Sequence, residues 1–141
     1  MKITAVIAEY NPFHNGHLKQ LKKAKRETNA DALVVVMSSS FTQHGDLCIQ
    51  DRYTRANWAI QAGADLVLEL PTVYSLSTAK GFAEGALKTL SMLGEYTLSF
   101  GTESDEIEDL NMAAEFMRSE SKDVSNLLKG YLLSLIHISE P

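Results

Sequence analysis

Short apolar runs alternate with longer amphipathic stretches through the first hundred residues. The runs are rich in β-branched residues and predict strands, and the stretches between them repeat apolar residues at helical spacing. The predicted strands span residues 3–7, 32–37, 66–70 and 95–100. The predicted helices span residues 16–28, about 51–63 and 77–93, with others after residue 103 and over 124–135. This order predicts an α/β fold with a Rossmann-like, doubly wound parallel sheet.

The same periodicity indicates which side of each helix should face the sheet. Asp51 is a good N-cap for the second helix. Pro71 ends the third strand, because proline cannot continue a ladder of hydrogen bonds. The predicted buried stripes are His17, Leu21, Ala24 and Thr28 in the first helix, Tyr53, Ala56, Ile60 and Gly63 in the second, and Ala79, Phe82, Ala86, Leu90 and Leu93 in the third.

The segment between the first strand and the first helix carries the most specific pattern, His14-Asn15-Gly16-His17. A helix N-terminus offers unpaired N–H groups and a partial positive charge, which favour phosphate. Two imidazoles there would bind phosphate oxygens and the charge that builds on them during reaction. A single histidine near a loop is usually a surface or capping residue. Two histidines flanking a glycine directly after a strand favour a nucleotide site, with His14 and His17 as the candidate catalytic residues.

His14-Asn15-Gly16-His17 resembles the signature of the HIGH nucleotidyltransferase superfamily, which includes class I aminoacyl-tRNA synthetases and cytidylyltransferases. The longer string from Glu9 to His17 resembles that of the bacterial tRNA(Met) cytidine acetate ligases. This resemblance implies an enzyme that activates acetate with ATP as acetyl-adenylate. It also implies acetylation of the wobble cytidine of elongator tRNA(Met), giving N4-acetylcytidine, with Mg²⁺ carried on the triphosphate.

The resemblance also assigns residues to ATP. They are Ile7, Ala8, Glu9, Tyr10, Asn11, Pro12, Phe13, His14, Asn15, Gly16, His17, Leu18, Lys19, Gln20 and Gly101. Gly101 follows the fourth predicted strand, across the switch point of the sheet from the first loop, where a glycine lets a nucleotide approach the backbone. Arg52 and Arg55 are three residues apart and should point the same way, as candidate phosphate or tRNA contacts. The alternative is a salt bridge to Asp51 or an exposed face.

A second polar segment, Ser38 to Asp46, follows the second predicted strand. Ligand sites in open α/β sheets form at this end of the strands. Phe41, Gln43 and Gly45 match the acetate ligases. The family usually has glycine and asparagine or aspartate at the positions of Ser39 and Ser40, and arginine at that of His44. These departures leave the substrate role of this segment open.

Charge is unevenly distributed along the chain. The net charge of −5 alone argues against a nucleic-acid partner. Residues 1–62, however, carry 8 basic and 5 acidic residues, whereas residues 63–141 carry 5 and 13. A basic first part is compatible with ATP and RNA, although the basic cluster late in the first helix also complements the helix dipole. The acidic residues from Glu103 to Asp109 suit a helix start better than a metal site.

Composition excludes several classes of protein. The single cysteine, Cys48, provides no disulfide framework, and no apolar stretch or signal peptide indicates a membrane or secreted protein. The sequence therefore predicts a cytoplasmic protein with no membrane partner. Neither a Gly-x-Gly-x-x-Gly nor a Walker pattern is present, which disfavours a dehydrogenase and a P-loop ATPase.

The expected organisation is one truncated nucleotidyltransferase-like domain over residues 1–131, followed by a non-native tail over 132–141. The family is much longer, so the chain resembles an N-terminal fragment. Two alternatives remain open. One is another nucleotidyltransferase of the superfamily, such as a pantetheine-phosphate or nicotinate-mononucleotide adenylyltransferase. The other is a nucleotide-binding remnant without turnover. Acetate and tRNA follow only from the resemblance.

Overall fold

The computed structural model describes residues 1–101 and residue 111 of the chain. The elements are β1 (Ile3–Ala8), α1 (Asn15–Thr28), β2 (Ala32–Ser38), α2 (Arg52–Gln61), β3 (Leu66–Leu70), α3 (Thr72–Ser75), α4 (Ala79–Ser91) and β4 (Thr97–Leu98). The predictions for the helices after residue 102, the acidic run, the boundary at residue 131 and the tail concern residues outside this described part.

All four strands are parallel and lie in the order β3-β2-β1-β4. The chain moves outward from β1 through β2 to β3, then crosses back to place β4 on the other side of β1. The switch point therefore lies between β1 and β4, and loops at the carboxyl ends of these strands border it. The doubly wound α/β fold predicted from the sequence is confirmed.

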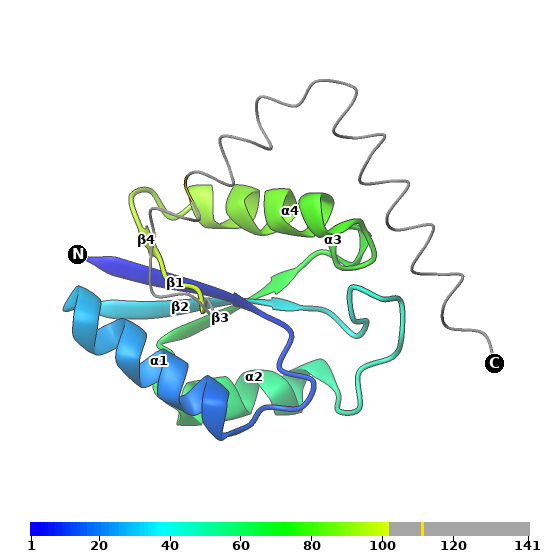
Figure 1. The fold of residues 1–141 in the computed structure, drawn as a ribbon, viewed down its shortest axis with the longest axis horizontal. Helices are drawn as coiled ribbons and strands as arrows, with labels where there is room; N and C mark the ends of the chain where they lie inside the picture. The colour runs from blue at the N-terminus through cyan, green and yellow to red at the C-terminus, as the bar shows by residue number, and fades with distance from the viewer. Residues whose placement is uncertain (102–110, 112–141) are drawn as a thin grey trace. The chain divides into compact units, whose positions relative to one another are not determined.

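Helices cover both faces of the sheet: α1 and α2 lie on one face and α3 and α4 on the other (Figure 1). Successive strand residues point to opposite faces. Leu33, Val35 and Met37 of β2 therefore enter the core beneath α1 and α2, while Val34 and Val36 enter the core beneath α4. Burial on both faces explains why the β2 run is apolar without alternation.

The predicted buried stripe of α2 is wrong at two of its four residues, whereas Ala56 packs against the core as predicted. Asp51 caps the helix as predicted, accepting from the backbone N–H groups of Tyr53 and Thr54. Tyr53, however, is 72% exposed and Ile60 is 45% exposed, while Arg55 and Ala59 are buried. Hydrophobic periodicity assumes that an arginine faces solvent. In α2, Arg55 faces the core instead, so the buried side of the helix differs from the predicted one.

Two further bounds differ from the prediction. The helix predicted over residues 77–93 is α4, which Thr78 caps through Gly81, and the four-residue α3 that precedes it was not predicted. Only Thr97 and Leu98 of the fourth run pair with β1, so β4 is shorter than predicted. Within the described residues, no helix combines the length and the apolar character needed to cross a membrane.

Candidate nucleotide site at the first loop

The first loop, residues 9–14, leads from β1 into α1 and is organised by the two histidines. His14 is the N-cap of α1, and its Nδ1 accepts from the backbone N–H of Gly16 at 3.0 Å. The Nδ1 of His17 accepts from the backbone N–H of His14 at 3.3 Å. Together they form a reciprocal capping box built from imidazoles, so each ring is fixed by the helix start that it caps.

The two imidazole rings are stacked, with centroids 3.7 Å apart and planes inclined by 23°. Because Nδ1 of each ring accepts a hydrogen bond, a neutral ring carries its proton on Nε2. Burial and the charge of neighbouring His14 lower the pKa of His17. The pair therefore presents two Nε2–H donors at a helix N-terminus, an arrangement suited to phosphate oxygens.

Gly16 has a local structural reason in addition to the predicted ligand approach. A Cβ at this position would lie 2.8 Å from Cε1 of His14. Any other residue would displace the capping imidazole, so the glycine in the His-x-Gly-His pattern allows the first histidine to cap the helix.

Tyr10 connects the loop to the core. Its backbone is left-handed, with φ 52°, a conformation that non-glycine residues adopt at a cost. Its ring is 1% exposed and packs edge-on against Phe13, with centroids 4.8 Å apart, and His17, at 4.9 Å. Burial raises the pKa of the phenol. The buried ring thus packs against the imidazole of His17.

A second loop, residues 39–50, lies against the first. The backbone N–H of Gln43 donates to Oε1 of Glu9 at 2.6 Å, and that of Ile49 donates to Oδ1 of Asn11 at 2.7 Å. A bridge between Phe41 and Leu47 closes the second loop into a narrow hairpin. Side chains of the first loop therefore hold the second loop by its backbone.

The two loops enclose an open cavity of about 540 Å³. It is lined by Ile7, Ala8, Glu9, Tyr10, Asn11, Pro12, His14, His17, Gln20, Thr42, His44 and Asp46. The structure thus brings together nine of the residues predicted to bind ATP. Phe13, Asn15, Gly16, Leu18 and Lys19 do not line the cavity.

Thr42 and Asp46 also line the cavity, although no motif in the sequence marks them individually as site residues. The available signal was the position of their loop after the carboxyl end of β2, where sites form in such sheets. His44 also lines this cavity, although it departs from the family pattern. The second loop therefore borders the cavity even at the position where its sequence departs from the family pattern.

Gly101 follows β4 and lies near Gln20 of α1. A Cβ built there would have Nε2 of Gln20 as its nearest neighbour, at 4.0 Å, which is ordinary van der Waals contact. Gln20 itself lines the cavity, so Gly101 is close to the predicted nucleotide site. Nothing in the described fold requires glycine at this position.

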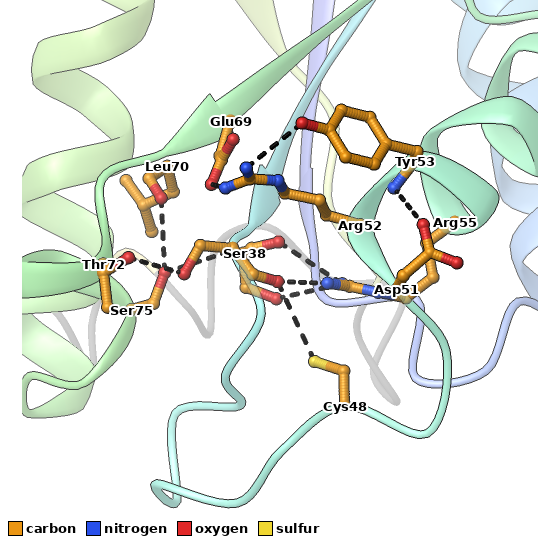
Figure 2. Close-up of polar contacts among 11 residues, drawn as sticks. Ser38, Cys48, Asp51, Arg52, Tyr53, Arg55, Glu69, Leu70, Thr72 and Ser75 are labelled. Atoms are coloured by element: carbon orange, nitrogen blue, oxygen red, sulfur yellow. Dashed lines mark hydrogen bonds and ion pairs between the residues drawn. The ribbon is translucent and has the colours of Figure 1, made fainter.

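The two arginines of α2 do not point the same way, contrary to the prediction. Arg52 binds Oε1 of Glu69 at 2.8 Å, and its guanidinium lies 5.0 Å from the ring of Tyr53 (Figure 2). Arg55 is completely buried and turns toward the carboxyl end of β2. The two side chains therefore do not form a common fork in this structure, in which Arg55 donates to protein carbonyl groups.

The sequence matches a known protein family over nearly its whole length. The family model described as HIGH Nucleotidyl Transferase matches residues 1–137. This chain belongs to the HIGH nucleotidyl transferase family. The histidine pair and the cavity between the first and second loops are therefore features of a chain of this family.

Its relatives include tRNA(Met) cytidine acetate ligases. That of Clostridium novyi is 43% identical over 133 residues, covering 94% of this chain and 33% of the relative. That of Kosmotoga olearia is 45% identical over 132 residues, covering 94% and 31%. A crystal structure of Thermotoga maritima TmcAL bound with alpha-thio ATP matches with a TM-score of 0.83 and 39% identity, covering 95% of this chain and 33% of that one. This chain spans about a third of the length of these proteins.

Proposed function

We propose that this chain is the ATP-binding, adenylating part of a tRNA(Met) cytidine acetate ligase. The observation that carries the proposal is the stacked pair His14 and His17 beside the cavity, in which neither Nε2 has a hydrogen-bond partner among the described residues. The identity to named ligases and the ATP analogue bound by the Thermotoga maritima relative support it.

In the proposed reaction an acetate oxygen attacks the α-phosphate of ATP in line, and diphosphate leaves with its bonding electrons. His14 and His17 donate to phosphate oxygens and stabilise the charge that spreads over them. The exocyclic amine of the wobble cytidine of elongator tRNA(Met) then attacks the acetyl carbon of acetyl-adenylate. AMP leaves, and the amine loses a proton to give N4-acetylcytidine. Positioning and electrostatics supply the catalysis, so no covalent enzyme intermediate is required.

Mg²⁺ would accompany the triphosphate and offset its charge. Among the described residues, no group of three or more histidine, cysteine or carboxylate side chains is arranged to hold a metal ion. We propose that the triphosphate itself would carry the ion. Gly101, beside Gln20, is the proposed approach point for the adenosine part of the nucleotide.

Product analysis tests this function. The full-length enzyme that contains this chain is incubated with ATP and labelled acetate, with and without elongator tRNA(Met). We expect AMP and diphosphate to form only with acetate, and label to enter the tRNA. A nucleotidylated phosphate-bearing small molecule, formed without acetate, would identify a different nucleotidyltransferase. ATP binding without any turnover would identify a nucleotide-binding remnant.

A further inference from the structure

Arg55 is a buried cation whose bonds all go to neighbouring backbone carbonyls and one hydroxyl. Its Nη1 donates to the Glu9 carbonyl at 2.6 Å and lies 3.3 Å from the Ser38 carbonyl and 3.4 Å from the Ser38 hydroxyl. Its Nη2 donates to the Ser39 carbonyl, and its Nε donates to the Gln50 carbonyl at 3.1 Å. Among the described residues, no carboxylate forms a salt bridge with it.

These acceptors lie in the first loop, at the end of β2 and at both ends of the second loop, and the two loops line the cavity. Glu9 begins the first loop, Ser38 ends β2, and Ser39 and Gln50 are the two ends of the second loop. Ser39 is also bonded to α3, because its backbone N–H donates to the Ser75 hydroxyl at 3.2 Å (Figure 2). A planar guanidinium can donate hydrogen bonds to several carbonyl groups in fixed directions, whereas a lysine ammonium acts as a point charge.

A short path leads from Arg55 to the histidines. The bond to the Glu9 carbonyl fixes the peptide plane that precedes Tyr10, whose left-handed φ of 52° needs support. The Tyr10 ring in turn packs on His17, with centroids 4.9 Å apart. Releasing the carbonyl would let Tyr10 relax to an ordinary conformation and would withdraw the ring that supports His17.

We infer that Arg55 is a positioning residue for adenylation. Its guanidinium clamps the first loop to both ends of the second loop and so holds His14 and His17 in place at the cavity. Arg55 does not touch the nucleotide and acts only through backbone carbonyls. This inference rests on the proposed function, since adenylation is the reaction that it assigns to the histidines.

The test compares Arg55→Lys and Arg55→Met with Leu90→Ala in the full-length enzyme. Leu90 is a completely buried residue of α4, on the other face of the sheet from α1 and α2, so its truncation destabilises the fold away from the loops. Acetyl-adenylate formation is measured without tRNA and divided by the folded fraction from urea unfolding. Leu90→Ala should retain kcat per folded molecule within twofold.

For Arg55→Lys we expect kcat per folded molecule to fall at least tenfold, and for Arg55→Met at least as much, with a smaller change in KM for ATP. That split follows because misplaced histidines lose transition-state contacts more than ground-state contacts. A kcat per folded molecule within twofold of wild type in either folded Arg55 variant would reduce Arg55 to a structural residue and overturn the inference.

A measurement on the wild-type enzyme decides the matter if neither Arg55 variant folds. Coupling between two equilibria is reciprocal, so if the clamp favours the binding-competent loops, a bound nucleotide must tighten the clamp. With arginine-selective ¹⁵N labelling, α,β-methylene ATP should slow hydrogen exchange of the Arg55 Nε–H at least threefold and leave that of Arg52 unchanged. Equal exchange with and without bound nucleotide would refute the clamp. Because this readout needs only nucleotide binding, it remains informative even if acetate is not the substrate.

Discussion

His14 and His17 each use one ring nitrogen to cap α1, and the other ring nitrogen makes no hydrogen bond within the described residues. Replacing either by alanine removes a donor aimed at developing charge, which typically costs about 2–4 kcal/mol of transition-state stabilisation. We expect His14→Ala and His17→Ala each to slow acetyl-adenylate formation to that extent in the full-length enzyme. Gln61→Ala, an exposed change at the end of α2, is the matched control. Rates within threefold of wild type would remove the histidines from the mechanism.

The lowered pKa of His17 gives a prediction for the pH dependence of folding. Burial and the nearby His14 lower this pKa in the folded state, whereas the pKa of a histidine in the unfolded chain is about 6.5. Between the two pKa values the unfolded chain binds a proton that the folded chain does not. Stability should therefore fall as pH decreases below about 6.5 and, for this group, level off above it. Urea unfolding at several pH values should show a weaker pH dependence in His17→Gln than in wild type, and identical profiles would contradict the assignment.

Gly101 tests the position of the nucleotide because the fold itself makes little demand for glycine there. Among the residues that the structure describes, a Cβ would meet only Nε2 of Gln20, at 4.0 Å. Gly101→Ala should therefore fold normally, and Gly101→Val should also fold but place branched carbons where the nucleotide is proposed to approach. We expect calorimetry to show weaker ATP binding in Gly101→Val than in Gly101→Ala. Wild-type affinity in a folded Gly101→Val protein would exclude this strand end from the site.

At the scale of single elements, α1 joins the proposed nucleotide site to a basic surface. Its N-terminus carries the histidine pair, and five of the ten lysine and arginine residues in residues 1–101 lie on this one helix. Lys19, Lys22, Lys23 and Arg26 recur at helical spacing on its exposed side. A tRNA strand that delivers its base to the helix N-terminus would pass this side with its phosphates.

We therefore expect the double variant Lys22→Glu, Arg26→Glu to raise KM for tRNA and leave acetyl-adenylate formation without tRNA unchanged. The salt dependence of tRNA binding should also weaken, by about 0.7–0.9 in logarithmic slope for each phosphate that the protein no longer neutralises. Lys80→Glu with Lys88→Glu on α4, across the sheet, is the matched control (Figure 1). An equal effect of both pairs would indicate a general charge effect instead of a tRNA-binding surface on α1.

The sequence predicted those elements whose signals are local. Continuous apolar runs located β2 and β3 within a residue, and the capping carboxylate of Asp51 located the start of α2. The four-residue α3 was missed because one turn has too few residues to show a helical period.

The contacts between loops were not predictable in the same way. The Glu9 carboxylate meets the backbone of Gln43 across 34 positions of sequence, and no local pattern encodes such a pairing. The burial of Arg55 was missed because hydrophobic periodicity scores residue types and does not count the carbonyl groups that can satisfy a guanidinium. The histidine pair could be predicted because the His-x-Gly-His pattern lies in the short segment between a predicted strand and a predicted helix, where a helix N-terminus can bind phosphate.

For the whole molecule, the described residues form a core on each face of the sheet. Val6, Leu21 and Val35 belong to the core beneath α1 and α2, and Val36 and Leu90 to the core on the side of α4. Helices on both faces of a parallel sheet are a complete layer arrangement for a small domain. We therefore expect the 141-residue chain to fold, or nearly fold, by itself, with the histidine pair in place.

Folding of this chain should not suffice for acetyl transfer. A tRNA is held by an extended basic surface, but residues 1–101 carry 10 basic and 9 acidic residues and the chain as a whole has a net charge of −5. The chain also spans only about a third of the ligases that it resembles. We expect weak ATP binding and no label in tRNA when this chain is incubated with ATP, labelled acetate and elongator tRNA(Met), beside a full-length relative as positive control. Transfer at a rate near that of the relative would show that one third of the length holds the complete catalytic unit, and that the basic side of α1 alone is enough to hold the tRNA.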